Sequence, residues 1–306
     1  MDLVKFSIAV LILLLFVIIF NLLIKKYTKL KSKDISFNTD LLKIIYSLWL
    51  FLFTLVPWFF IIYFSFSSKT KTGFTLDNYI KAFSPVYMKV FFESFELAVI
   101  STIMCFIVAF PAAFILTKIP IKKRNVYIVL FVLPLCTNFL LRTYSWINIF
   151  RTKGLINTIL INLNIITEPI VFLNTKYAVI VGMVYNFLPF MLLPIFTSLS
   201  NIKQEYVDSA MDLGCNKIKL FFKIYIPLSM KGIVSGAMLV MMPAISTFII
   251  SDLLGGSQNS LIGNLIQREF LQARNFEGGS AFSVILIAII LFLMFILKSF
   301  AKKYDE

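Results

Sequence analysis

The chain has 306 residues, of which 59% are hydrophobic and only 14% are charged, whereas a soluble domain carries about 25% charged residues. The apolar residues come in long blocks and include 34 Phe, so neither an ordinary water-soluble domain nor a disordered chain fits this composition. The formal net charge of +14 would suggest a nucleic-acid partner in a soluble protein, but here Lys and Arg flank the apolar blocks and therefore indicate membrane topology.

Seven apolar blocks are predicted to cross the membrane as helices, because a bilayer core about 30 Å thick needs about 20 apolar helical residues. They cover approximately residues 6–24, 44–66, 97–117, 126–148, 177–199, 232–252 and 280–297. The expected fold is therefore an all-α polytopic membrane protein. Residues 1–43 are predicted to form an extra N-terminal transmembrane anchor with a basic linker, and residues 44–306 a six-helix membrane domain. A cleaved signal peptide is the alternative for the first block, but no small-x-small cleavage site precedes its lysines.

Basic residues gather in alternate connections between the predicted helices. Of the 29 Lys and Arg residues, 18 lie within residues 25–43, 118–124, 203–231 and 298–303. Positive residues favour the cytoplasmic side of a membrane. We therefore place the N-terminus outside, the C-terminus in the cytoplasm, and long external loops near residues 67–93, 149–176 and 253–279.

Reporter fusions test this topology. A reporter fused after Lys33 is expected to lie in the cytoplasm, and one fused near Ser68 outside it, because the lysines cluster before the second block. Alkaline phosphatase and green fluorescent protein, which are active on opposite sides of the membrane, provide the measurement. A cytoplasmic signal from the Ser68 fusion would show that the helix count or the orientation is wrong.

Gly232 and Gly236 lie four residues apart in the sixth block. This small-x-x-x-small spacing lets two membrane helices approach each other closely. We therefore expect the block 232–252 to pack tightly against a neighbouring helix through these glycines.

The connection from about residue 200 to 231 is predicted to form two short helices at the cytoplasmic membrane surface. The first is expected to begin near Asn201 and Gln204, which form a helix-start pattern, and to end at Gly214, a typical C-terminal cap. Its apolar face is expected to contain Tyr206, Ala210 and Leu213. The following stretch, NKIKLFFKIYIPL, predicts a second helix that Pro227 stops.

One interpretation of this element is a helix pair that lies on lipid, since its lysines would suit anionic headgroups. However, its sequence resembles the EAA loop of ABC-transporter permeases: Glu-Ala-Ala, three residues, Gly, nine residues, then Ile-x-Leu-Pro. The matching residues are Asp208-Ser209-Ala210, Gly214, Ile224 and Ile226-Pro227. The chain departs from the pattern at Asp208, Ser209 and Ile226, and each departure keeps the charge, the size or the apolarity.

The resemblance implies that the helix before Gly214 couples the chain to a cytoplasmic ATPase, by docking into a groove on that partner. The residues that it assigns to this coupling loop are Glu205, Asp208, Ser209, Ala210, Gly214, Ile224 and Pro227. The loop pattern alone identifies only the superfamily.

Further motifs are similar to one branch of these permeases, the spermidine/putrescine importer permeases of the PotB type. The segments that carry this similarity are FTLDNY at 74–79, Thr137-Asn138, TKG at 152–154, LPFM at 188–191, SDLLGG at 251–256 and LIGN at 261–264. The similarity covers about residues 44–300. It implies a bacterial plasma-membrane permease subunit that forms, with a second homologous permease, the channel of an ATP-driven polyamine importer.

The implied partners are a cytoplasmic ABC ATPase dimer, the second permease, an extracytoplasmic polyamine-binding protein, membrane lipid and a small cationic substrate, with no nucleic acid. The chain itself is expected to be non-catalytic and to hold no cofactor, since it has no GxxxxGK[ST] phosphate-binding loop. ATP and Mg²⁺ would be bound by the partner ATPase. No metal site is expected, because the chain has no His and its three Cys lack metal-type spacing.

Two alternatives remain open. The chain could serve the same kind of importer for another substrate, such as ferric iron, sulfate or an opine-like amine. A secondary transporter or channel belongs to a different class, and it would be expected to show inverted repeats, which the hydropathy pattern does not.

A polyamine carries about two or three ammonium groups near neutral pH. Carboxylates and aromatic faces compensate such groups when they leave water. The candidate residues near the external membrane ends are Asp252, Glu96, Glu93, Tyr144 and Trp146. Asp252 is the first choice, because it is expected to end an otherwise apolar helix. The alternative for these acids is an interfacial charge or a partner for Arg142.

Overall fold

The computed structural model describes residues 46–68, 73–256 and 259–302. These residues form helices and connecting turns, and no strand occurs among them. The chain divides into two compact units, with the boundary between Phe64 and Ser65. The first described helix runs over Tyr46–Ser65 and contains a π-helical turn, η1 (Phe51–Leu55), followed by α3 (Val56–Ser65). The predicted N-terminal block 6–24 and the predicted domain boundary at residue 43 lie outside the described residues.

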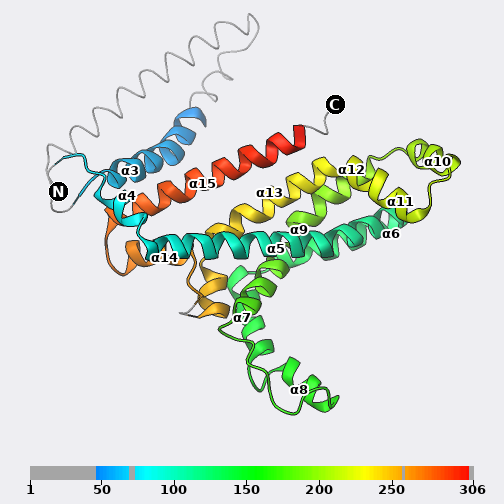
Figure 1. The fold of residues 1–306 in the computed structure, drawn as a ribbon, viewed down its shortest axis with the longest axis horizontal. Coiled ribbons are helices and arrows are strands. Elements are labelled where there is room, and N and C mark those ends of the chain that lie inside the picture. Colours follow the sequence, from blue (N-terminus) through cyan, green and yellow to red (C-terminus); the bar gives the residue numbers. More distant parts are fainter. Residues whose placement is uncertain (1–45, 69–72, 257–258, 303–306) are drawn as a thin grey trace, which may run out of the picture. The chain divides into compact units, whose positions relative to one another are not determined.

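A bundle of long helices forms the second unit (Figure 1). The helices α5 (Pro85–Lys118), α9 (Lys176–Ser200) and α13 (Met230–Ser246) pack against one another, and α15 (Phe276–Lys302) packs against α13. The largest fully buried side chains of their interfaces include Leu97, Met183, Met191, Leu192, Ile195 and Val240. Many other apolar side chains are exposed, as expected for helices whose solvent is lipid.

Four described helices are long and apolar enough to cross a membrane. They are Tyr46–Ser65, Pro85–Lys118, Lys176–Ser200 and Phe276–Phe300, which correspond to the predicted blocks 44–66, 97–117, 177–199 and 280–297. Two bent helix pairs raise the number to six if each pair makes one span. The prediction of an all-helical polytopic fold is therefore confirmed.

The predicted span 126–148 is wrong as a single helix. The chain forms α6 (Ile121–Val132) and a 3₁₀ turn, η2 (Leu133–Cys136), and then bends by 93° into α7 (Phe139–Phe150) and α8 (Leu155–Asn162). The bend has a local cause. Thr137 is extended, and the Asn138 side chain accepts hydrogen bonds from the N–H groups of the next helix.

The predicted span 232–252 is also interrupted. The helix α13 ends at Ser246, Thr247 is extended, and residues 251–255 form a separate π-helical turn, η4 (Ser251–Gly255). A distant segment lies close to this end, because a Cβ atom on Gly263 would meet the backbone carbonyl oxygens of Ser246 and Thr247. The prediction that Asp252 ends the apolar helix is therefore wrong. Asp252 lies on the turn that follows this helix.

The connections between the long helices lie at two ends of the bundle. The helices α10 (Gln204–Asp212) and α11 (Lys217–Leu220) lie at one end, near the start of α6 (Figure 1). The helices α4 (Asp77–Ala82) and α14 (Ile262–Leu271) lie toward the other end. This arrangement groups the predicted cytoplasmic connections 118–124 and 203–231 together, opposite α4 and α14, which belong to two of the predicted external loops.

Candidate functional site

The helix α10 ends in a turn that depends on Gly214. Gly214 has a φ of +78°, which places it in the left-handed region. Its N–H donates to the Met211 carbonyl at 2.9 Å, and the Cys215 N–H donates to the Ala210 carbonyl at 3.0 Å. These two bonds form a Schellman motif, so the predicted C-terminal cap is confirmed. No atom lies within 4 Å of a Cβ built on Gly214, so the constraint at this position comes from the backbone.

The helix begins at Gln204, within the predicted start, but Asn201 is the C-cap of α9, and Lys203 precedes α10 without a side-chain cap. Of the predicted apolar face, only Ala210 packs against the core, where it is partly buried. The side chain that packs into the core is Val207, which is 5% exposed, whereas Leu213 is 89% exposed. Val207 is the buried residue of α10, and most of its other residues are exposed.

The tip of the loop presents apolar side chains to its surroundings. The exposed apolar residues are Tyr206, Met211, Leu213, Ile218 and Phe222. The predicted coupling residues Glu205, Asp208 and Ser209 are also exposed, and Asp208 accepts a hydrogen bond of 2.9 Å from the Gln204 amide. Exposed apolar groups gathered in this way indicate a surface that another molecule covers.

The second half of the loop continues as α11, a π-helical turn η3 (Phe221–Tyr225) and α12 (Ile226–Leu228). The helical run 217–228 ends at Leu228, one residue after Pro227, so the predicted end is confirmed to within one residue. The chain then bends at Ser229, by 64°. Ile224 is partly buried against the core of the bundle.

Aromatic rings pack this half of the loop against the end of α5. The ring of Phe221 meets Phe110 edge-on with centroids 5.3 Å apart, and Tyr225 meets Phe114 in the same way at 4.8 Å. The Lys118 Nζ donates to the Tyr225 hydroxyl at 3.3 Å. Close-packed rings therefore connect this half of the loop to α5.

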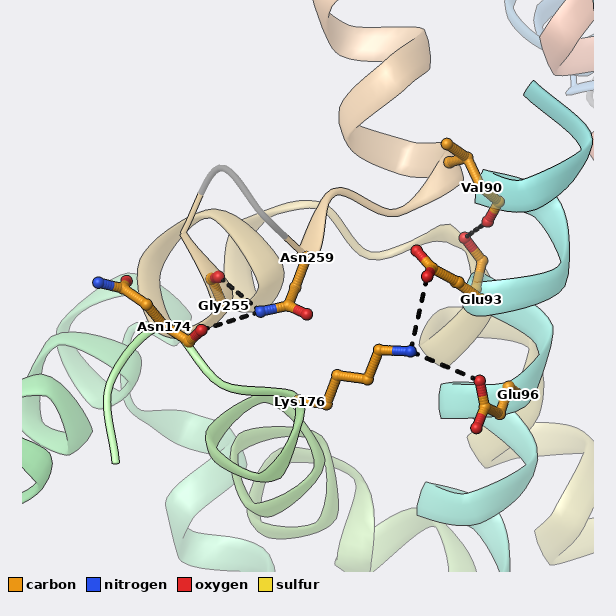
Figure 2. Close-up of polar contacts among 8 residues, drawn as sticks. Val90, Glu93, Glu96, Asn174, Lys176, Gly255 and Asn259 are labelled. Atoms are coloured by element: carbon orange, nitrogen blue, oxygen red, sulfur yellow. Dashed lines mark hydrogen bonds and ion pairs between the residues drawn. The ribbon is translucent and has the colours of Figure 1, made fainter. Parts of the chain in front are cut away.

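At the other end of α5, two of the predicted acids lie together. The Nζ of Lys176, the first residue of α9, is 3.6 Å from the Glu93 Oε1 and 3.6 Å from the Glu96 Oε2 (Figure 2). Lys176 therefore bridges both carboxylates and joins α9 to α5. The Glu96 side chain is 56% exposed and that of Glu93 is 25% exposed.

The backbone around Lys176 is held by hydrogen bonds from the segment that follows α13. The Asn174 N–H donates to the Leu254 carbonyl at 2.8 Å. The Asn259 amide donates to the Asn174 carbonyl at 3.0 Å (Figure 2). The same Asn259 amide donates to the Gly255 carbonyl at 2.9 Å. The backbone of Asn174, two residues before Lys176, is thus anchored independently of the Lys176 side chain.

Asp252 lies on η4, is exposed, and has a side-chain partner that the sequence did not indicate. The amide of buried Asn264 donates to the Asp252 Oδ1 at 2.5 Å and to the Phe248 carbonyl at 3.0 Å. Arg142, the alternative partner of the acids, donates instead to the Pro134 carbonyl, and its guanidinium group lies 6.0 Å from the centre of the Tyr185 ring. Asp252 is therefore held in place by a neutral amide.

The two predicted aromatic residues lie on α7, which contacts η4. Trp146 packs edge-on against Tyr185 with ring centroids 5.3 Å apart and also contacts Phe150. Tyr144 is exposed. Trp146 therefore has a packing role in the bundle, and a part for either ring in a substrate pathway stays a prediction.

Sequence reasoning missed Lys176, Asn259 and Asn264. Asn264 was present in the LIGN segment without a role, and Lys176 was one of many basic residues in a predicted external loop. No local pattern connects Lys176 with Glu93, because the contact depends on how α5 and α9 pack. The acids themselves were found from their position near a membrane end.

Comparison with known proteins gives close relatives over most of the chain, although no family model matches it. The chain is 39% identical to the spermidine/putrescine transport system permease protein PotB of Haemophilus influenzae over 266 residues, which are 85% of this chain and 93% of that protein. It is 40% identical to the PotB protein of Escherichia coli K12 over 246 residues, which are 79% of this chain and 90% of that protein.

Solved structures share the fold. A chain of a bacterial ABC transporter involved in the import of the acidic polysaccharide alginate superposes with a TM-score of 0.72 at 15% identity, covering 88% of this chain and 96% of that one. A chain of the inward-facing MetNI methionine ABC transporter superposes with a TM-score of 0.53 at 13% identity, covering 71% and 95%. At these identities the likeness concerns the fold alone.

Proposed function

Because the chain belongs to the family of PotB permeases of spermidine/putrescine transport systems, we propose that it forms half of the membrane channel of an ATP-driven polyamine importer. The chain is a multi-pass, non-catalytic subunit of the bacterial plasma membrane. Its proposed partners are a second homologous permease, a cytoplasmic ATPase dimer and an extracytoplasmic polyamine-binding protein. One observation carries the proposal: the Gly214-capped helix with exposed apolar residues lies at the end of the bundle opposite the external acids.

The proposed coupling step begins at α10. An ATPase groove would cover the exposed side chains of Tyr206, Met211 and Leu213, which removes apolar surface from water. Movement of the ATPase would then displace α10 together with η3. Because Phe221 and Tyr225 pack against α5, this displacement would move a single helix of 34 residues. The opposite end of that helix carries Glu93 and Glu96.

The proposed cargo is a small organic cation with several ammonium groups. Glu93, Glu96 and Asp252 supply negative charge at the external end, and aromatic side chains there supply polarisable faces. Such groups replace part of the water that an ammonium group loses on entering a channel. The carboxylates themselves favour a cation over an anion such as sulfate, although Lys176 and Lys89 offset part of their charge.

Transport by the complete complex tests the function. The chain, its second permease, its ATPase and its binding protein are reconstituted in proteoliposomes, and uptake of radiolabelled putrescine and spermidine is measured with and without ATP inside. We expect ATP-dependent uptake that excess unlabelled polyamine abolishes and that sulfate, ferric citrate or an opine leaves unchanged. Absence of polyamine uptake by a complex that hydrolyses ATP would refute the polyamine assignment.

Replacing Asp252 with asparagine tests its place in the pathway. The asparagine carbonyl can accept the same hydrogen bond from Asn264, so Asp252→Asn keeps the geometry of the turn and removes its charge. We expect uptake at subsaturating polyamine to fall about tenfold, the scale of one charge-assisted hydrogen bond, while the variant still assembles with its ATPase. Wild-type uptake at equal expression would rule out this role for Asp252.

A further inference from the structure

Lys176 provides an ammonium group that is part of the chain itself and lies between two candidate substrate acids. Its Nζ lies at the same distance, 3.6 Å, from a carboxylate oxygen of Glu93 and from one of Glu96 (Figure 2). An amine substrate would approach these carboxylates with the same functional group. A substrate ammonium group that approaches the Glu93 Oε1 or the Glu96 Oε2 would therefore compete with Lys176 for that oxygen.

The carboxylates are accessible from an open hollow along α5. The residues that line it are Lys89, Phe92, Glu93, Phe95, Glu96, Val99 and Ile100. Phe92 and Phe95 are both exposed, and aromatic faces beside carboxylates attract an ammonium group. The hollow therefore combines two features that recognise organic cations, independently of the ion pairs with Lys176.

The ion pairs of Lys176 can break without disturbing the fold. The lysine side chain is 41% exposed, and ion pairs with this exposure are weak. Hydrogen bonds hold the backbone before Lys176, whereas its side chain is a flexible four-carbon stem. The ammonium group of Lys176 can thus turn into water while α9 stays in place.

We propose that Lys176 is a tethered competitor of the substrate for Glu93 and Glu96, and that it determines specificity for cations with several ammonium groups. This inference rests on the proposed function. A tethered group acts at a high effective concentration. An amine with one ammonium group would displace one ion pair and form a similar one, so it gains little over the tethered lysine. A polyamine has further ammonium groups, which can engage the second carboxylate or the rings of Phe92 and Phe95.

Replacing Lys176 with methionine keeps the apolar stem and removes the charge. In the reconstituted transporter, Lys176→Met is expected to raise putrescine uptake at subsaturating concentration about threefold or more, the scale of one exposed ion pair. The variant is also expected to be more sensitive to n-butylamine, an amine with one ammonium group. The butylamine concentration that inhibits uptake by half is expected to fall. Lys89→Met is the matched control, because it removes the same charge from the same hollow without breaking either ion pair.

Chemical restoration of the ammonium group separates competition from a structural effect. Lys176→Cys is combined with Cys136→Ser and Cys215→Ser, which leaves only the buried Cys105 as a second thiol on the chain. Treatment with 2-aminoethyl methanethiosulfonate attaches an ammonium group and is expected to return uptake and butylamine inhibition to wild-type values. Methyl methanethiosulfonate attaches a neutral group of smaller size and is expected to leave the variant unchanged.

Three results would overturn the inference. The first is an equal effect of Lys176→Met and Lys89→Met on uptake. The second is an effect of Lys176→Met that stays the same when Glu93 and Glu96 are both replaced by glutamine. The third is failure of the ammonium-bearing reagent to restore wild-type uptake and inhibition. These results presuppose polyamine uptake by the wild-type complex. If the wild type does not import polyamines, the proposed function itself is refuted, so the two failures are distinguishable.

Discussion

A transporter in which valine replaces Gly214 is expected to lose at least nine tenths of its ATP-driven uptake, although the permease still reaches the membrane. The backbone at Gly214 has a φ of +78°, a conformation that costs a residue other than glycine about 1–3 kcal/mol and costs a β-branched residue most. The valine would relieve this strain by leaving the left-handed region. The hydrogen bonds to the Ala210 and Met211 carbonyls would then break, and α10 would present its exposed residues in a different direction.

The measurement is co-purification of the ATPase with the permease, together with uptake in proteoliposomes. Gly214→Asn is the matched control, because asparagine adopts the left-handed conformation more readily than other non-glycine residues. Space is not the difference, since no atom lies within 4 Å of a Cβ at this position. Normal ATPase binding and full uptake by Gly214→Val would show that the turn does not orient the coupling helix. Equal defects in both variants would point to a surface contact instead of backbone strain.

Most of the membrane helices could be predicted from the sequence, because lipid requires long apolar helices whose backbone bonds are satisfied internally. The breaks in two of them were harder to predict. Asn138 carries a local signal, since its side chain caps α7, but the surrounding apolar residues hid it. The end of α13 at Ser246 has no local signal of comparable strength, and the segment that approaches it, at Gly263, is distant in the sequence.

In the candidate sites, too, local features could be predicted from the sequence, whereas contacts between distant segments could not. The Gly214 cap could be predicted because a Schellman motif is formed by residues within one turn of each other. The face of α10 that packs on the bundle could not, because Val207 is buried by helices from elsewhere in the chain. The contact of Lys176 with Glu93 and Glu96 likewise depends on the packing of α9 against α5. The sequence therefore indicated the acids but not the lysine that forms ion pairs with them.

A permease in which valine replaces Gly232 is expected to be almost absent from the membrane in folded form. The helix α13 packs against α9 at this glycine, and a Cβ atom there would lie 2.5 Å from the Pro194 carbonyl oxygen and 2.5 Å from the Ser198 Cβ. The carbonyl belongs to the backbone of a long helix and cannot move aside as a side-chain end can. Overpacking typically costs about 1–3 kcal/mol, and here the two helices must separate along an interface that close packing alone stabilises.

The amount of permease in the membrane and the midpoint of its thermal unfolding after detergent extraction provide the measurement. Ser235→Val is the matched control, because it adds a β-branched side chain to the exposed side of the same helix, and it is expected to keep both values.

Gly236→Ala is expected to destabilise less than Gly232→Ala, since its shortest contact, 2.8 Å, is to the Sδ of the flexible Met191 side chain. Wild-type abundance and thermal midpoint for Gly232→Val would mean that α13 and α9 do not meet at these glycines, and the predicted role of the small-x-x-x-small spacing would then be wrong.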